Sequence, residues 1–289
     1  MVRSLNSGVS GMQQFQQRMD VIGNNIANVN TTGYKSARMD FADAFSQTYR
    51  GASAGTSTTS STDPVQVGTG VLASAIKSLF TQGTINRTGP QTDLAISGDG
   101  FFMVADPTSG AQYATRSGDF RLDQSYRLVT NNGFRVQGFT DPGLSTEGDI
   151  VIDGTGRPAT SDPLATVSSY AIGQNGMITV RLSDGTEFAR GQILMQRFSD
   201  PNALTKQGNN LYSSMSAAGP LTSGTAASGA SAPGSNGLGI VEASALELSN
   251  VDLAKEFADL IVTQRAFQAN ARIITTSDEM LQELVNLKR

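Results

Sequence analysis

The sequence predicts an α+β fold: N- and C-terminal helices pair as a coiled-coil core, and an antiparallel β-rich domain lies between flexible linkers. Apolar residues recur at helical spacing near both chain ends, whereas the middle is rich in glycine and hairpin-turn sequences. We divide the chain into a discontinuous helical core at 1–45 and 247–289, a linker or insertion at 46–70, a β-rich outer domain at 71–216 and a Gly/Ser/Ala-rich linker at 217–246.

The N-terminal helix is predicted from an apolar stripe whose members are three or four residues apart. These members are Leu5, Val9, Met12, Phe15, Met19, Ile22, Ile26 and Val29. A surface helix on a globular core is one interpretation. The stripe is narrow and its opposite face is rich in glutamine, which favours pairing with a helix at the other terminus. The helix should end in the turn-forming cluster 28–33, where Gly33 can adopt a left-handed conformation.

The C-terminal helix is predicted from Ser249 onward, because Ser249 and Asp252 form a capping-box pattern and no proline or glycine follows Gly239. A seven-residue repeat with alternating steps of four and three indicates a coiled-coil seam. Its positions are Leu253, Phe257, Leu260, Gln264, Phe267, Ala271, Ile274, Asp278, Leu281 and Val285. A helix of about 40 residues would be about 60 Å long, so it requires a partner helix.

The middle of the chain carries the signals of short antiparallel strands. Asn132-Gly133, Asn175-Gly176 and Asp184-Gly185 are strong hairpin signals. Apolar and polar residues alternate over 177–182, as in a half-buried strand. The stretch 51–63 consists almost wholly of Gly, Ala, Ser and Thr and is expected to be a flexible loop.

The composition excludes several classes of function. The 289 residues include no histidine and no cysteine, which removes the commonest general base and the usual zinc ligands. The net charge of −4 without a basic tract argues against nucleic acid. No stretch has the length of a membrane span, and no secretory leader is evident. We therefore expect no catalysis, no cofactor, no metal, no nucleic acid, no membrane insertion and export without a cleaved signal peptide.

Two long amphipathic helices without a catalytic site suggest assembly, because one molecule cannot bury both stripes. Repeated subunits could bury the remainder and form a helical filament or tube. Two other classes were considered. A carboxylate-pair hydrolase acting on cell-wall glycan would need a buried cleft, and an adhesin-like surface protein would leave the terminal seam unexplained.

Several long runs resemble the bacterial flagellar hook and basal-body rod proteins. They are DVIGNNIANVNTTGYK at 20–35, DLAISGDGFFMV at 93–104, TRSGDF and LVTNNGFRVQGF within 113–139, and the C-terminal stretch 249–289. The resemblance implies a structural axial subunit whose terminal helices form a coiled-coil core lining an export channel. It also implies a self-assembled helical polymer, contacts with other axial proteins (rod, hook cap and hook–filament junction), and passage through the flagellar type III export apparatus.

Within this family, the chain end and the segment ATRSGDF favour the hook, a bending universal joint. The alternative is the distal rod, a stiff drive shaft. The small size of the middle domain is compatible with either, and the stretch 47–70 resembles an insertion of distal rod proteins. We expect the stretch 51–63 to determine stiffness.

The residues expected at the assembly interface come from both helices. They are Leu5, Val9, Met12, Met19, Ile22, Ile26, Asn24, Asn25, Asn28, Leu253, Phe257, Leu260, Phe267, Ile274, Leu281 and Val285. The three asparagines are singled out by the resemblance, and they either bond to a backbone near the helix end or simply face solvent.

Overall fold

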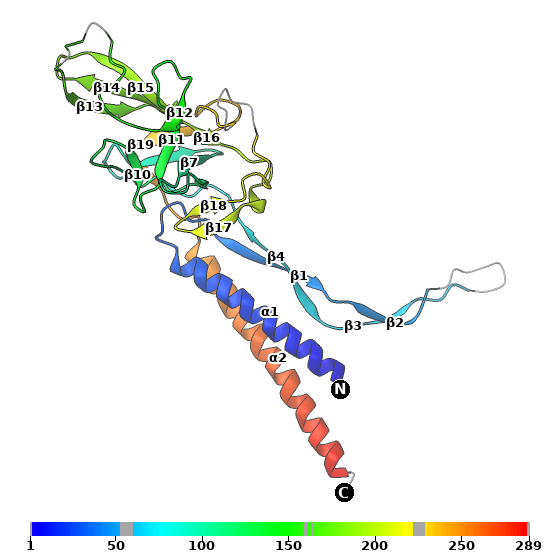
Figure 1. Ribbon diagram of the computed structural model, residues 1–289. Coiled ribbons are helices and arrows are strands. Elements are labelled where there is room, and N and C mark those ends of the chain that lie inside the picture. The colour runs from blue at the N-terminus through cyan, green and yellow to red at the C-terminus, as the bar shows by residue number, and fades with distance from the viewer. Residues whose placement is uncertain (1, 53–59, 159–160, 163, 222–228, 288–289) are drawn as a thin grey trace. The chain divides into compact units, whose positions relative to one another are not determined.

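The computed structural model describes residues 2–52, 60–158, 161–162, 164–221 and 229–287 (Figure 1). It confirms the α+β class, with two terminal helices and a central antiparallel β-rich region. The chain forms two compact units. Unit 1 comprises Met1–Ala27, Ser36–Leu79 and Val251–Arg289, and unit 2 comprises Asn28–Lys35 and Phe80–Asn250.

In unit 1, helices α1 (Val2–Ala27) and α2 (Leu253–Leu287) pack side by side and run antiparallel (Figure 1). The predicted start of α2 at Ser249 is wrong. The helix begins after Asp252, whose carboxylate Oδ1 accepts from the amides of Ala254 at 2.9 Å and Lys255 at 3.3 Å. Asp252 is therefore the N-cap, since its carboxylate satisfies two amides of the first turn. Neither helix, within the described residues, is long and apolar enough to cross a membrane.

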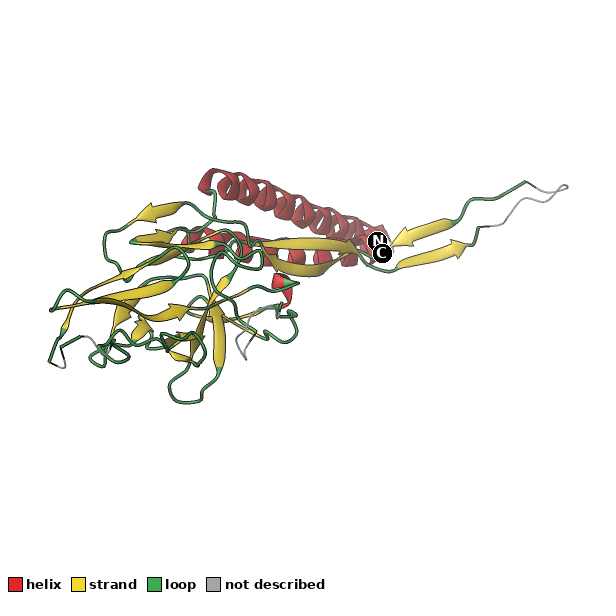
Figure 2. Cartoon of the chain, turned by 90° about the horizontal axis from the view of Figure 1, so that it is seen from above, coloured by secondary structure: helices red, strands yellow, loops and turns green. Residues whose placement is uncertain are grey.

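A two-stranded ribbon completes unit 1. Strand β1 (Ala37–Asp43) pairs with β4 (Val71–Ser78), and β2 (Ser46–Arg50) pairs with β3 (Val65–Gly68), both antiparallel (Figure 2). The stretch expected to be a linker, 46–70, thus contains paired strands, because threonine, tyrosine and valine there favour extended backbone. Strand β4, expected in the outer domain, belongs to unit 1. Part of the expected flexible loop, 53–59, lies outside the described residues.

Unit 2 is built from short strands and one 3₁₀ turn. They are β5 (Ile85–Arg87), β6 (Leu94–Ser97), β7 (Phe101–Ala105), β8 (Gln112–Thr115), β9 (Phe120–Leu122), β10 (Leu128–Thr130), β11 (Arg135–Phe139), β12 (Glu147–Asp149), β13 (Val167–Ile172), β14 (Met177–Leu182), β15 (Glu187–Ile193), β16 (Met195–Gln196), η1 (Pro201–Ala203), β17 (Thr205–Gly208), β18 (Leu211–Ser213), β19 (Ile240–Ala243) and β20 (Ala245–Glu247). The largest sheet has the order β13-β14-β15-β11-β7-β8-β18-β17.

The three predicted hairpin turns are confirmed. They connect the antiparallel pairs β10–β11, β13–β14 and β14–β15. The glycine of each turn, at 133, 176 and 185, has a positive φ, which this residue adopts without steric cost.

Strand β7 is buried on both faces and separates two apolar cores. Phe102 and Val104 belong to a larger core that also contains Ile178 and Ile193. Phe101 and Met103 point to the opposite face and belong to a smaller core. Because successive side chains of a strand point in opposite directions, one strand serves both cores.

The stretch 217–246, expected to be a linker, is instead an integral part of unit 2. Strand β19 pairs with β6, and β20 pairs with β5. Val241 is fully buried in the larger core, and Ala218 is buried in the smaller one. The small residues that suggested flexibility allow close packing here. Residues 222–228 of this stretch lie outside the description.

Candidate assembly surface

One face of α2 packs against α1 and follows a seven-residue repeat. Its more buried positions include Glu256, Leu260, Thr263, Phe267, Asn270, Ile274, Ser277 and Leu281. Half of these positions are apolar and the other half are polar or small. The seam therefore consists of an apolar ladder beside a polar ladder.

Two glycines of α1 allow a close approach of the two helices. A Cβ added to Gly8 of α1 would lie 3.4 Å from Ile274 Cγ1, and one added to Gly11 would lie 2.6 Å from Asn270 Nδ2. Thr263 and Ser277 are buried, and each hydroxyl donates to a carbonyl oxygen one turn earlier in α2, at 2.7 Å. The helix itself thus satisfies these two hydroxyls.

This seam differs from the predicted one. Leu260, Phe267, Ile274 and Leu281 lie in both, and Ala271 of the predicted seam is also half-buried. Leu253, Phe257 and Val285, together with Gln264 and Asp278, are exposed. The predicted seam omitted Thr263, Asn270 and Ser277, because a count of apolar residues does not include polar side chains.

The predicted stripe of α1 is only partly covered within unit 1. Ile22 is buried, whereas Leu5, Val9, Met12, Met19 and Ile26 are half-buried. The fully buried positions of α1 also include Gly8, Gly11 and Gln14, which the stripe did not contain. The stripe is thus not the seam itself but the flank beside it.

Asn25 has the most specific role of the three predicted asparagines. Its side chain is buried and pairs with the backbone of Ala37 like a strand, with Nδ2 donating to Ala37 O and Oδ1 accepting from Ala37 N, both at 2.9 Å. Nδ2 also lies 3.0 Å from Glu256 Oε1 on α2. Asn25 therefore joins the end of α1, the start of β1 and the first turn of α2.

The other two asparagines lie elsewhere. Asn24 is exposed on α1. Asn28 belongs to unit 2, where its carbonyl oxygen accepts from the amide of Thr31 and its Oδ1 accepts from the Thr31 hydroxyl, both at 3.1 Å. It therefore shapes the turn after α1.

The β1–β4 and β2–β3 ribbon contacts a different face of α1. The rings of Phe15 and Phe41 meet edge to face with centroids 5.8 Å apart. Arg3 Nη2 donates to Gln47 Oε1 at 2.6 Å, and its guanidinium lies 5.1 Å from the centre of the Tyr49 ring. These contacts hold the ribbon to the helix pair.

Unit 1 leaves a large set of apolar side chains exposed. On α2 they are Leu253, Phe257, Ile261, Val262, Ile273, Met280, Leu284, Val285 and Leu287, and on the ribbon they are Phe41, Phe45, Tyr49, Val65, Val67, Leu72 and Ile76. We call these two sets the α2 patch and the ribbon patch. Phe45 is 92% exposed and Phe257 is 50% exposed. Large exposed apolar patches typically mark protein–protein interfaces.

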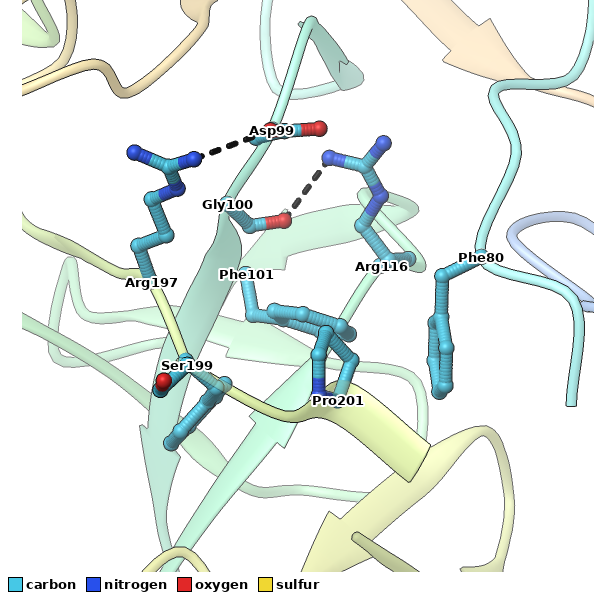
Figure 3. Close-up of a pocket in the computed structure, with 9 residues that line it drawn as sticks. Phe80, Asp99, Gly100, Phe101, Arg116, Arg197, Ser199 and Pro201 are labelled. Carbon is cyan, nitrogen blue, oxygen red and sulfur yellow. Dashed lines mark hydrogen bonds and ion pairs between the residues drawn. The ribbon is translucent and has the colours of Figure 1, made fainter. Parts of the chain in front are cut away.

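Unit 2 contains a pocket of about 290 Å³ lined by Phe80, Phe101, Phe198 and two arginines (Figure 3). Both arginines already have partners. Arg116 Nη1 donates to Gly100 O at 2.7 Å, and Arg197 Nη2 lies 3.6 Å from Asp99 Oδ2. The pocket therefore offers an aromatic wall but no uncommitted charge. No cluster that could hold a metal ion occurs among the described residues.

A helical unit with uncovered apolar surface, joined in one chain to a β-rich unit with closed cores, defines a structural assembly protein. Comparisons with known proteins agree. The profile "Flagella basal body rod protein" matches residues 5–35, "Flagellar hook protein FlgE/F/G D1 domain" matches 95–180, and "Flagellar basal body rod FlgEFG protein C-terminal" matches 242–287.

Individual relatives match from end to end. The flagellar basal-body rod protein FlgG of Bacillus subtilis is 44% identical over 289 residues, and that of Borreliella burgdorferi is 36% identical over 293 residues. The flagellar hook protein FlgE of Borreliella burgdorferi is 29% identical over 450 residues. Each comparison covers 100% of both chains. The crystal structure of Helicobacter pylori flagellar hook protein FlgE2 covers 65% of this chain and 47% of its own, with 14% identity and a TM-score of 0.23, too low to inform the fold.

The chain belongs to the bacterial flagellar hook and basal-body rod protein family, as its sequence motifs predicted. It is a structural subunit of the flagellar axis and not an enzyme.

Proposed function

We propose that this protein is a subunit of the flagellar basal-body rod and that copies of it polymerise through unit 1. The observation that carries the assembly part is the contrast in burial. Unit 2 encloses two apolar cores, whereas unit 1 exposes the α2 patch and the ribbon patch. Burial of those patches between copies is favourable because it removes apolar area from water.

The rod is preferred to the hook, which the sequence motifs favoured, for a reason of length. Two relatives named as rod proteins align over 289 and 293 positions, close to the 289 residues of this chain. The alignment with the hook protein extends over 450 positions, so it opens long gaps opposite this chain of 289 residues. A comparison with the rod proteins leaves no such difference in length to explain.

In this proposal, the four shared seam residues, Leu260, Phe267, Ile274 and Leu281, hold α2 to α1 within one subunit. The exposed predicted positions, Leu253, Phe257 and Val285, face a neighbouring copy. The half-buried flank of α1, which contains Leu5, Val9, Met12, Met19 and Ile26, extends the same interface. The expected partners also include other axial proteins at the polymer ends and the type III export apparatus. Export through this apparatus would need no cleaved signal peptide.

Electron microscopy of isolated hook–basal bodies tests the location. An antibody against unit 2 should label the straight shaft within the cell envelope if the protein forms the rod. Label along the curved segment outside the cell would instead identify it as a hook subunit. An absence of label on both would contradict an axial location.

Truncation tests the role of the terminal helix. Removal of 249–289 should abolish polymerisation of the purified protein, measured by sedimentation and negative-stain microscopy. Leu260→Asp should do the same, because it places a charge in the α1–α2 seam. If polymers still form without 249–289, the assembly surface lies elsewhere in the chain.

A further inference from the structure

A cluster of three buried charged residues lies in unit 2. Lys35 Nζ is 2.6 Å from Glu247 Oε1, and Arg116 Nε is 3.3 Å from Glu247 Oε2. The side chains of Lys35 and Glu247 are fully buried, and that of Arg116 is 4% exposed. Two cations and one anion in such a site are costly to desolvate, so their arrangement requires precise partners.

The three residues come from three distant parts of the sequence. Lys35 ends the segment 5–35, Arg116 lies within 95–180, and Glu247 lies within 242–287, so that each of the three matched family segments supplies one member. Lys35 and Glu247 are separated by 212 positions.

The cluster is attached to the places where the chain leaves unit 2. The chain passes between the units after Ala27, after Lys35, after Leu79 and after Asn250. Three segments of unit 2 adjoin the last three of these points, namely 33–35, 81–84 and 247–250, which we call the exit segments.

Glu247 contacts the other two exit segments directly. Its backbone oxygen accepts from the amide of Gly33 at 2.8 Å, and its Oε1 accepts from the amide of Gly83 at 2.9 Å. Lys35 Nζ also donates to Thr81 O at 2.8 Å. One carboxylate and one ammonium group therefore tie all three segments together.

The backbone is shaped to permit this convergence. Gly33 has a φ of +67°, and a Cβ there would lie 2.6 Å from the amide nitrogen of Ser117. A Cβ at Gly83 would overlap the carbonyl oxygen of Leu248. Leu248 N donates to Thr84 O at 2.9 Å, and Asn250 Nδ2 donates to Thr81 Oγ1 at 2.8 Å. The exit segments thus approach one another at backbone distance.

Arg116 links the cluster to the main sheet region. Its guanidinium donates to Gly98 O at 2.9 Å and to Gly100 O at 2.7 Å, next to strand β7 (Figure 3). The excess positive charge of the cluster is thereby balanced by carbonyl oxygens as well as by Glu247.

We propose that Lys35, Arg116 and Glu247 form a clamp that makes the three exit segments open and close as one cooperative element. If the protein acts as a rod subunit, which is the function proposed above, force passing along the chain between the units enters and leaves unit 2 at this element. The clamp itself is a property of the single chain and can be tested without any polymer.

Hydrogen exchange of the purified monomer tests the clamp in the wild-type protein. The amides of Gly33, Gly83 and Leu248 report one exit segment each. In low concentrations of urea, their exchange should be governed by one common opening, with the same free energy and the same dependence on urea. Three different opening energies would show that the segments move independently and would overturn the proposal.

Glu247→Gln tests the role of charge, since it keeps the shape of the side chain but removes the anion. The three amides should exchange faster together, by about 100-fold, because the buried cations lose their partner. The amides of Val104 and Ile193 in the sheet should exchange as before. Faster exchange at Gly83 alone would reduce the cluster to a local ion pair and contradict the clamp.

Glu187→Gln is the matched control. It makes the same chemical change in the pair Arg181–Glu187, whose atoms are 3.8 Å apart and whose side chains are both 59% exposed. It should leave exchange at the three amides unchanged. The two variants together also separate this inference from the proposed function, because microscopy of hook–basal bodies locates the protein whatever the monomer exchange shows.

Discussion

The two units treat large apolar side chains in opposite ways. Phe102 in β7 of unit 2 is fully buried, whereas Phe257 in α2 of unit 1 is half exposed. Both residues lie within regular elements. Unit 2 thus encloses two apolar cores, whereas unit 1 exposes apolar surface of the kind that protein–protein interfaces bury.

The largest effect on the free energy of unfolding is expected from Phe102→Ala. Phe102 packs edge to face on Phe120 with centroids 5.2 Å apart, inside the larger core. Its truncation should cost about 3–5 kcal/mol, because it leaves a cavity. Urea unfolding of the monomer, followed by circular dichroism, measures the loss. Leu164→Ala, at an exposed site, should change stability by less than about 0.5 kcal/mol. Similar losses from the two variants would mean that unit 2 is not closed on itself.

Asn25→Asp should have the next largest effect, and it acts on unit 1. The substitution removes the amide donor to Ala37 O and to Glu256 and places two carboxyl groups together. A loss of about 2–3 kcal/mol is expected from the unpaired buried groups. Burial already raises the pKa of Glu256, so acidification should relieve part of the loss in this variant. The measurement is urea unfolding followed by the helical circular dichroism signal. Asp20→Asn, on the exposed side of α1, is the control variant.

The pH dependence of stability tests the charged cluster of unit 2. Burial lowers the pKa of Lys35, although Glu247 opposes the shift. The folded protein therefore binds fewer protons than the unfolded chain between that lowered pKa and the ordinary value of 10.5. The free energy of unfolding should rise with pH across this window.

The measurement is the urea midpoint of unfolding at several pH values between about pH 8 and about pH 9, where tyrosine remains largely protonated in both states. Burial raises the pKa of Tyr212, which would lower stability at higher pH, and burial lowers the pKa of Lys206 with the same sign as for Lys35. In Lys35→Met, the free energy of unfolding should rise less steeply with pH. The rise that remains is the contribution of Lys206. An unchanged slope in this variant would remove Lys35 from the explanation.

Phe257→Ala should have the smallest effect on the monomer. Because half of the side chain is already exposed, its truncation should cost less than about 1 kcal/mol. Phe267→Ala, in the α1–α2 seam, should cost more. Polymerisation should be slowed by both variants, but only Phe257→Ala should do so without loss of monomer stability. If Phe257→Ala polymerises normally, the α2 patch is not the subunit interface.

The fold class followed from the sequence because its signals are local. The periodicity of the terminal stretches and the Asn-Gly and Asp-Gly turns each depend on a few neighbouring residues. The position of the α2 seam depends on α1 as well. Asn270 lies against Gly8 and Gly11 of α1, and no count of apolar residues in α2 contains that information.

Glu247 illustrates a site that the sequence pattern concealed. It alternates with Leu246 and Leu248, so a simple strand pattern places the leucines inside and the glutamate in water. In the structure Glu247 and Ala245 are buried and Leu246 is half-buried. The reversal depends on Lys35 and Arg116, which are far away in sequence. Asn25, in contrast, was singled out by the family motif, although its bond to Ala37 was not foreseen.

The hydroxyls of Thr263 and Ser277 have a consequence for how reversibly the helices join. Each hydroxyl donates to a carbonyl oxygen of its own helix, so separation of α1 from α2 would leave neither hydroxyl without a hydrogen-bond partner. At these two positions, parting costs only the lost packing, and water need not replace a broken bond. At these two positions, the helices can therefore separate and pack together again while every hydrogen bond of the two hydroxyls is kept.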